Sequence, residues 1–293
     1  MMQGRIMRGV AGVYDILAED GKQYECKPKG IFRNQKIKPL VGDLVSIEIL
    51  NSTMLTGLIV EIKPRHSEII RPAVANIDQA AVVFAAAAPE PNLNLLDRFL
   101  IVMACQQIET IICFNKVDLI SEDKKRLLKD RYQRSGCKVL FLCAAQNEGI
   151  SSLQSQLQDR ITVLAGPSGV GKSTIVNLLS QKTKMETGKL SEKIQRGKHT
   201  TRYSQLIELW KGTYLFDTPG FSSLSIEDIQ EKELKNYYAE FQLLEEQCKF
   251  NGCVHLNEPG CAVKEAVAIG KINLERYETY RLLYEELKSK RKY

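Results

Sequence analysis

The chain has 293 residues, of which 44% are hydrophobic and 26% are charged, a balance typical of a globular protein with a buried core. No run of about 18 apolar residues is present, and the first residues lack the apolar core of a signal peptide, so we expect a cytoplasmic protein with no membrane partner. The formal net charge of +6 is compatible with RNA binding but does not by itself indicate it.

Residues 1–66 alternate short β-strand patterns with turn residues. The segments are RGVAGVYDIL, KQYECKP, VGDLVSIEIL and TGLIVEI, separated by Gly, Asp, Lys and Pro. This spacing predicts a five-stranded β-barrel of the OB type, a fold that often binds oligonucleotides. A barrel that only packs against its neighbour is the alternative that these residues leave open.

Residues 67–224 show near-continuous apolar runs that alternate with helical segments. The runs are NIDQAAVVFAAA, TIICFN, KVLFLCA and ITVLAG. A helix is predicted between the first two, with an apolar face made of Leu96, Phe99, Leu100 and Met103, and another is predicted to start at Ser121. Buried strands that alternate with helices predict a parallel sheet and therefore a central α/β domain.

GPSGVGKST at 166–174 follows an apolar strand, precedes a helix and matches the phosphate-binding pattern G-x-x-x-x-G-K-[ST]. The glycines let backbone N–H groups converge on phosphate oxygens. Lys172 is expected to reach the β- and γ-phosphates and to support catalysis, and Ser173 to bind Mg²⁺. The predicted phosphate contacts are Gly166, Pro167, Ser168, Gly169, Val170, Gly171, Lys172, Ser173 and Thr174.

Two polar segments after this loop are candidates for sensing the γ-phosphate. In DTPGF, Asp217 ends an apolar strand and is the expected Mg²⁺-side carboxylate, while Gly220 can offer its N–H to the γ-phosphate. RGKHTTRY carries Thr200 and Thr201, both candidate nucleotide contacts. The sequence does not decide which of the two binds Mg²⁺; we assign Thr201 to the metal with Ser173 and Asp217.

One departure from Ras-like GTPases bears on catalysis. Phe221 stands where those proteins place a water-orienting Gln, so intrinsic hydrolysis is expected to be slow unless another residue helps. His199 is the candidate catalytic residue, and a surface histidine without a role is the alternative.

NKVD at 115–118 ends an apolar strand and resembles a guanine-recognition loop. Asp118 can accept hydrogen bonds from guanine N1 and N2, a pattern that adenine does not offer, so the site is expected to prefer GTP. A further loop, CAAQNEG, is expected to supply a backbone N–H to guanine O6. The residues predicted to recognise guanine are Asn115, Lys116, Val117, Asp118, Cys143 and Ala144.

The order of these elements is the reverse of that in ordinary GTPases, because the guanine loops precede the phosphate loop. If the N- and C-termini of an ordinary GTPase domain were joined and its chain were opened after the DTPGF segment, the loops would follow the order seen here and could form the same nucleotide site. The sequence therefore predicts a circularly permuted GTPase domain. The chain then enters its C-terminal segment directly, and we expect loss of the γ-phosphate to move Gly220 and that segment together.

Residues 225–293 predict a helical domain that contains a metal site. SIEDIQEKELKNYYAEFQLLEEQ has a helical pattern, and so does the final segment, with Tyr277, Tyr280, Tyr284 and Leu287 at helical spacing. Between them stand Cys248, Cys253, His255 and Cys261, three thiolates and one imidazole that suit one structural Zn²⁺. Coincidental clustering or a disulfide is the alternative. The remaining cysteines are predicted to be buried hydrophobic residues: Cys26, Cys105, Cys113, Cys137 and Cys143.

Taken in order, the motifs resemble the RsgA family, also called YjeQ or YloQ, over nearly the whole chain. The resemblance rests on NKVD, GPSGVGKST, GKHTTR at 197–202, DTPGF and the Cys–Cys–His–Cys set. It implies a cytoplasmic bacterial GTPase that acts late in assembly of the small (30S) ribosomal subunit. It also implies that the OB-fold and the zinc domain grip the subunit around its decoding region, that the subunit stimulates hydrolysis of GTP to GDP, and that hydrolysis releases the factor. The family has a histidine at the position of His199.

The partners expected for the leading function are the small subunit and its 16S rRNA. Two other functions stay open at this level. One alternative is a GTP-gated switch that binds RNA with incidental hydrolysis; the other is a GTPase that acts on a protein partner without RNA. No feature indicates an obligate oligomer, and we expect a monomer.

Overall fold

The computed structural model describes residues 1–69, 73–187, 205–217 and 226–290. The chain divides into two compact units. The first consists of Met1–Ala80, Ser151–Ala165 and Ile175–Phe221, and the second of Ala81–Ile150, Gly166–Thr174 and Ser222–Tyr293.

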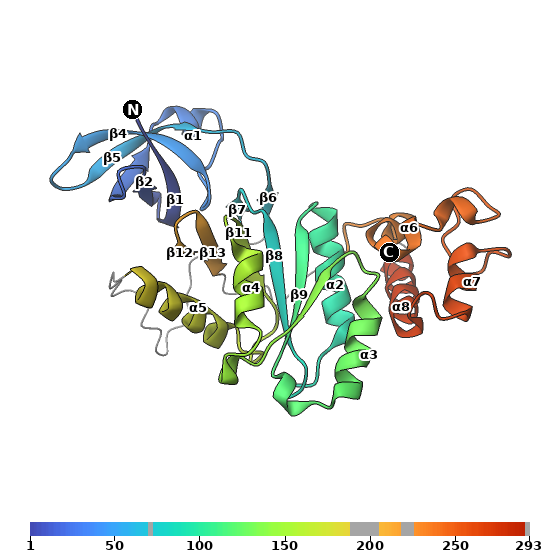
Figure 1. Ribbon diagram of the computed structural model, residues 1–293. Coiled ribbons are helices and arrows are strands. Elements are labelled where there is room, and N and C mark those ends of the chain that lie inside the picture. The colour runs from blue at the N-terminus through green and yellow to red at the C-terminus, as the bar shows by residue number, and fades with distance from the viewer. Residues whose placement is uncertain (70–72, 188–204, 218–225, 291–293) are drawn as a thin grey trace. The chain divides into compact units, whose positions relative to one another are not determined.

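A five-stranded barrel forms the N-terminal part of the first unit (Figure 1). Its strands are β1 (Met2–Val10), β2 (Val13–Ala18), β3 (Gln23–Pro28), β4 (Leu44–Asn51) and β5 (Thr56–Ile62), with the short helix α1 (Ile31–Asn34) between β3 and β4. Pairing runs β1-β2-β3-β5-β4, and β4 pairs back with β1 to close the barrel. Ile6, Ile16, Ile47 and Ile59 are fully buried inside it. The predicted barrel is confirmed.

The segment RGVAGVYDIL is a hairpin and not the single strand that its composition suggested. The turn falls at Ala11 and Gly12, whose φ angles are 49° and 81°. Two successive positive φ values define the tight turn that matches the twist of paired strands, so β1 reverses directly into β2.

The chain leaving the barrel is bonded to it over residues 63–69. Asp43, which is fully buried, accepts hydrogen bonds from Arg65 Nε at 2.7 Å and from Arg65 Nη2 at 2.9 Å. A short sheet follows, in which β6 (Glu68–Ile69) pairs with β7 (Val74–Ala75). These contacts hold the segment against the barrel.

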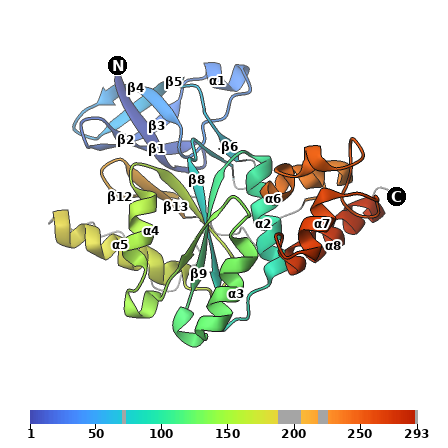
Figure 2. The ribbon, with the colours of Figure 1, turned by 45° about the vertical axis from the view of Figure 1, so that its right-hand side comes forward.

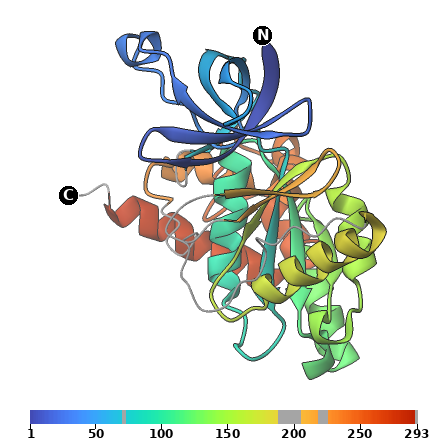
Figure 3. The same cartoon turned by 90° about the vertical axis from the view of Figure 1, so that its left-hand side faces the viewer.

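Three further strands of the first unit continue the barrel's sheet. They are β11 (Ile161–Ala165), β12 (Gln205–Trp210) and β13 (Thr213–Asp217), accompanied by the helices α4 (Ile150–Leu157) and α5 (Lys172–Thr187). Strand β13 runs parallel to β11 and antiparallel to β12. Strand β12 meets β1 where Gln205 pairs with Arg8, and Figure 3 shows the barrel in blue beside this hairpin. The strand before the phosphate loop and the strand that ends in Asp217 are therefore neighbours.

The second unit contains a sheet in the order β10-β9-β8. Its elements are β8 (Gln79–Ala85), α2 (Leu93–Cys105), β9 (Glu109–Asn115), a 3-10 turn at Val117–Leu119, α3 (Glu122–Tyr132), β10 (Lys138–Phe141) and a second 3-10 turn at Ala144–Gln146. Helix α2 packs on the sheet through its buried apolar face, which consists of Leu96, Phe99, Leu100 and Met103 as predicted. Tyr132 of α3 packs on Phe114 of β9, and Ser121 Oγ caps α3 by accepting from Lys124 N. Parallel pairing of β9 with β10 bears out the α/β prediction.

The C-terminal region belongs to the second unit, where Figure 2 shows it beside α2 and α3. Its elements are the 3-10 helices at Glu231–Tyr237 and Glu245–Gln247, α6 (Ala239–Gln242), α7 (Ala262–Ala268) and α8 (Leu274–Lys290). The expected helical run before the cysteine cluster is broken into short pieces, because Tyr238 adopts an extended backbone and its ring stacks on Phe241 in the core. Tyr277, Tyr280, Tyr284 and Leu287 are buried packing residues, as predicted.

The five other cysteines differ in their burial. Cys26, Cys113 and Cys143 are buried as predicted, and Cys137 is half-buried. The prediction is wrong for Cys105, which is exposed because it is the last residue of α2, beyond the apolar face of that helix. Within the described ranges no helix is both long and apolar enough to span a bilayer.

Candidate functional site

Asn115 joins the three loops that the sequence singled out. It ends β9 and is 2% exposed. Its Oδ1 accepts from Ala144 N at 3.0 Å, and its Nδ2 donates to the Val170 carbonyl at 2.9 Å. One buried amide thus fixes the NKVD loop, the loop after β10 and the phosphate loop relative to one another within the second unit.

Lys116 makes a second link to the phosphate loop. Its backbone is left-handed, with φ at 62°, and its Nζ donates to the Gly169 carbonyl at 2.9 Å and to the carbonyl of Ala88. Ala88 lies in the loop after β8, and nothing in the sequence pattern marked it, because a backbone carbonyl can belong to any residue type.

Cys143 contacts the carboxylate that is expected to read guanine. Its Sγ lies 3.0 Å from Asp118 Oδ1, and burial together with this carboxylate raises the pKa of the thiol, so the thiol stays protonated and donates. Asp118 itself is exposed and Cys143 is fully buried. The buried thiol of Cys143 therefore orients the exposed carboxylate of Asp118 from the interior of the protein.

The backbone N–H groups of this loop are partly engaged within the protein. Cys143 N donates to the Glu148 carbonyl at 3.1 Å, and Ala144 N donates to Asn115. Among the described residues, no partner is found for the N–H of Ala145, which is exposed. Ala145 is thus an exposed backbone donor of this loop, a residue that the sequence analysis did not select.

The phosphate loop has the tight geometry that its glycines predict. Gly166 has φ at 131°, and a Cβ there would lie 2.0 Å from the Val83 carbonyl oxygen; at Gly171, with φ at 99°, a Cβ would lie 2.3 Å from Asn115 Nδ2. Neither position can hold a side chain without displacing its neighbour. Ser168, Gly169, Ser173 and Thr174 are exposed at this loop, whereas Val170 is buried.

Lys172, the first residue of α5, lies across the phosphate loop. Its Nζ donates to the carbonyls of Gly166 at 2.7 Å and Pro167 at 2.6 Å. Burial lowers the pKa of this ammonium below its ordinary value, because desolvation disfavours the charged form. The two hydrogen bonds hold the lysine at the phosphate loop, whose backbone N–H groups suit phosphate oxygens.

The remaining nucleotide-site residues belong to other parts of the chain. The backbone of Asp217 ends β13 and pairs with Leu164, two residues before Gly166 in the sequence. Strand β13 therefore ends beside the strand that leads into the phosphate loop, and the assignment of Asp217 to Mg²⁺ stays a prediction. His199, Thr200, Thr201 and Gly220 lie outside the described residues.

Cys248, Cys253, His255 and Cys261 come together in one compact cluster. Their candidate ligand atoms all lie within 4.8 Å of one another. His255 Nδ1 is 3.4 Å from Cys261 Sγ and 3.6 Å from Cys248 Sγ, close to the separations that tetrahedral coordination by sulfur and nitrogen produces. Burial raises the pKa of Cys253 to about 12 and also raises the pKa of Cys261. Such buried sulfurs become thiolates only beside a cation, so the donor set fits a metal ion.

The cluster is supported by a second layer of hydrogen bonds. Tyr277 Oη donates to the His255 carbonyl at 2.6 Å, and Tyr280 Oη donates to the Val254 carbonyl at 2.5 Å. The Glu258 carboxylate accepts from Val254 N and Leu256 N at 2.8 and 2.9 Å. These bonds fix the loop that carries the histidine, so α8 positions the candidate metal site.

A buried charge network attaches the C-terminal region to the helices that follow the guanine loops. Asp97 of α2, which is fully buried, accepts from Arg276 of α8 at 2.6 Å and lies 3.4 Å from Arg131 of α3. Arg276 also pairs with Glu240, and the ring of Tyr238 lies under its guanidinium. The sequence analysis missed this network; a charged Asp97 within the apolar pattern NLLDRFLIVM was the one available signal.

The fold and the site together define a P-loop GTPase whose guanine loops precede its phosphate loop in the chain. A family model described as RsgA GTPase matches residues 62–227, and one described as the RsgA N-terminal domain matches residues 3–59. The chain belongs to the RsgA GTPase family, whose members hydrolyse GTP.

Several relatives match over almost their full length. The protein named small ribosomal subunit biogenesis GTPase RsgA from Agathobacter rectalis is 50% identical, with 100% of both chains covered. The protein of the same name from Caldanaerobacter subterraneus is 45% identical, with 99% of this chain and 97% of the relative covered.

Two solved structures share the fold. The crystal structure of YloQ, described as a circularly permuted GTPase, matches with a TM-score of 0.82 and 37% identity, covering 99% of this chain and 96% of that one. YjeQ from Thermotoga maritima gives the same TM-score at 34% identity, with 98% of each chain covered. The permuted order predicted from the motifs is therefore confirmed.

Proposed function

We propose that this chain binds GTP at the joined loops of the second unit and hydrolyses it to GDP and phosphate during biogenesis of the small ribosomal subunit. The observation that carries the proposal is the buried Asn115 amide, which holds a guanine loop and a phosphate loop in one arrangement. The names of the full-length relatives support the role in the small subunit.

Guanine recognition is assigned to the carboxylate of Asp118. Its two oxygens can accept from guanine N1 and N2, while the Cys143 thiol donates to one of them from the buried side. The donor to guanine O6 is assigned to the loop after β10. Since Ala144 N is already bonded to Asn115, the N–H of Ala145 is the better candidate there.

Lys172 and the phosphate-loop N–H groups are assigned to the phosphates, and Ser173, Thr201 and Asp217 to Mg²⁺. When bound, Mg²⁺ neutralises charge on the β- and γ-phosphate oxygens. Lys172 would exchange its carbonyl contacts for phosphate oxygens, which offer a stronger, charge-assisted bond. His199 is assigned the orientation of the attacking water, because Phe221 cannot hydrogen-bond to it.

The Cys3His cluster is assigned one structural Zn²⁺. Four protein ligands leave no position for a reacting water, so the ion stabilises the fold and takes no part in hydrolysis. The zinc content of the purified protein tests this assignment. A variant in which two of the cluster's cysteines are replaced by Ser serves as the metal-free control.

GTP turnover with and without isolated small subunits tests the function, with large subunits as the control. We expect strong stimulation by the small subunit alone, loss of turnover in His199→Ala with GTP binding retained, and loss of both in Lys172→Ala. Tight GTP binding without stimulation would instead favour the GTP-gated RNA switch. Subunit binding that is insensitive to salt would favour a protein partner, because phosphate contacts release counterions.

A further inference from the structure

The loop after β8, residues 86–91, is fixed at both of its ends within the second unit. At its start, Ala86 donates its N–H to the Asn115 carbonyl at 2.7 Å. At its end, Asn92 caps α2, where its Oδ1 accepts from Leu95 N at 3.0 Å. The loop is therefore attached to the strand of the guanine loop on one side and to a helix on the other.

Between these two anchors the loop contacts the NKVD loop and the phosphate loop together. The Ala88 carbonyl accepts from Lys116 Nζ, which also donates to the Gly169 carbonyl at 2.9 Å. The Pro89 ring lies beside Gly169, since a Cβ added to that glycine would be 4.0 Å from Pro89 Cδ. The ammonium of Lys116 thus joins three loops, and Ala88 provides one of its two acceptors.

Ala88 has a backbone conformation that alanine rarely adopts. Its φ angle is 47°, and the φ angle of Lys116, the residue that it contacts, is 62°. Residues in such conformations persist only where the surrounding structure fixes them, and they are found preferentially at ligand sites. Ala88 is exposed, so burial of its methyl group does not account for the angle. The contact that the angle provides is the one between the Ala88 carbonyl and Lys116.

This contact has a consequence for nucleotide binding. A lysine side chain has many rotamers, and holding it in one of them costs conformational entropy. Because Ala88 and Gly169 already hold the Nζ of Lys116, that cost is met before a nucleotide arrives, and a preorganised site binds more tightly. We propose that Ala88 is a positioning residue for guanine nucleotides: its carbonyl preorganises Lys116, so that the loop 86–91 slows nucleotide release. The inference rests on the nucleotide site proposed above.

The test measures the affinity and the dissociation rate of a fluorescent GDP analogue on the zinc-loaded, full-length protein. Ala88→Val should raise the Kd and the dissociation rate about tenfold, near the lower end of what a hydrogen bond to a charged group contributes. A β-branched residue does not tolerate a positive φ, so the carbonyl turns away from Lys116. Ala88→Gly tolerates the angle and should recover most of the affinity. The control Ala11→Val introduces the same side chain at a φ of 49° in the barrel hairpin and should change neither quantity.

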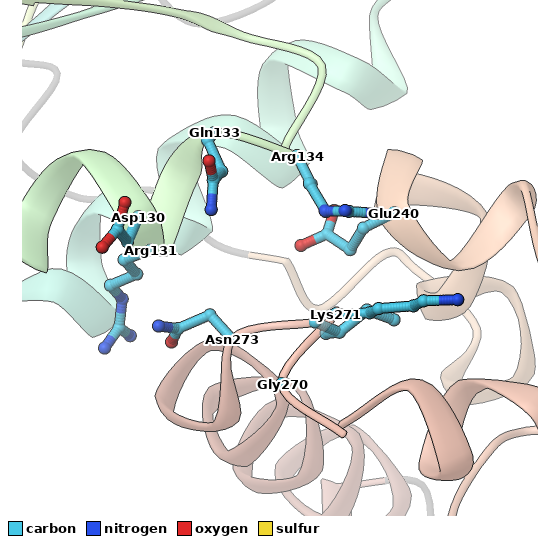
Figure 4. Close-up of a pocket in the computed structure, with 9 residues that line it drawn as sticks. Asp130, Arg131, Gln133, Arg134, Glu240, Gly270, Lys271 and Asn273 are labelled. Carbon is cyan, nitrogen blue, oxygen red and sulfur yellow. The ribbon is translucent and has the colours of Figure 1, made fainter. Parts of the chain in front are cut away.

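A double-mutant cycle shows whether Ala88 acts through Lys116. Lys116→Met should weaken binding at least as much as Ala88→Val does, and Ala88→Val should add little in that background. Lys271→Met controls for the lost charge. Lys271 belongs to none of the nucleotide loops and lines a pocket between the end of α3 and the C-terminal elements, where Figure 4 shows it beside Gly270 and Asn273.

Steady-state turnover separates positioning from a general loss of folded protein. In Ala88→Val the KM for GTP should rise about tenfold with kcat unchanged, because the contact is made in the ground state and the transition state alike. A merely structural role would lower the fraction of active protein, and therefore kcat, at constant KM.

The inference is overturned if Ala88→Val binds GDP as the wild type does, if Ala11→Val weakens binding equally, or if the losses in the cycle are additive. Should Ala88→Val not fold, Ala88→Leu imposes a milder strain at the same angle and is judged by the same cycle. A wild-type protein that binds no guanine nucleotide would remove the proposed function and this inference together. Normal nucleotide binding without stimulation by small subunits would count against the proposed function alone.

Discussion

Replacing Gly171 by Ala tests whether the buried amide of Asn115 couples the phosphate loop to the guanine loop. The new Cβ would lie 2.3 Å from Asn115 Nδ2, so the amide must move and its bond to the Val170 carbonyl is lost. Placing an L-residue at positive φ costs about 1–2 kcal/mol, and leaving the buried carbonyl without its donor adds about 1–3 kcal/mol. Gly169, with φ at 78° and its nearest neighbour 4.0 Å from the added Cβ, provides a control that carries the backbone strain alone.

Nucleotide affinity, measured by titration with a fluorescent GDP analogue, should therefore fall about 5- to 150-fold further in Gly171→Ala than in Gly169→Ala. Thermal unfolding of both variants, followed by circular dichroism, verifies that each is folded. A double-mutant cycle with Asn115→Ala should show that the two changes share one contact, because the second loses most of its effect once the first is made. Equal losses in the two glycine variants, or additive losses in the cycle, would refute the coupling.

Three further outcomes are expected. Cys143→Val should weaken GTP binding through loss of the thiol donor to Asp118, and Cys143→Ser should preserve most of it; equal weakening in both would assign the cysteine to packing. Asp97→Ala should lower the free energy of unfolding by about 3–5 kcal/mol, since it removes the carboxylate that Arg276 and Arg131 share and leaves two buried cations with Glu240 as their buried counter-charge. Arg281→Ala on the exposed face of α8 should change it by no more than about 0.5 kcal/mol; urea denaturation distinguishes them. Zinc should leave the Cys3His cluster as the pH falls, because protons compete with the metal for the thiolates; a chelator dye follows the release, and release that rises with pH would contradict the assignment.

The nucleotide loops were predictable because each works as a short contiguous segment. The glycines of 166–171 are needed for backbone angles and close approaches that other residues do not tolerate, so the chemistry appears in the letters themselves. The Cys3His cluster was predictable for a related reason, since its four candidate ligands fall within 14 residues, from Cys248 to Cys261. Strand and helix types followed from local apolar patterns.

Local patterns failed where tertiary packing decided the outcome. Helical periodicity before the cysteine cluster predicted one longer helix, yet the segment forms the 3-10 helix Glu231–Tyr237 and the short α6, separated by the buried Tyr238. The hairpin at Ala11 and Gly12 was hidden because the strand propensities on both sides of the turn are alike. The broken helix reflects burial in the core, whereas the hairpin is set by two residues of positive φ between strands that are neighbours in the chain.

By itself, the sequence determined that this protein has a barrel, a permuted GTPase domain and a Cys3His cluster that could hold a metal ion, because those properties depend on residues that are close in the chain. Only the tertiary structure decided which side chains connect the segments of the chain to one another. Asn115 meets Val170 across 55 positions and Arg276 meets Asp97 across 179. A sequence cannot distinguish such a buried aspartate or arginine from the solvated charges beside it, because burial and partner geometry arise only when distant elements pack together.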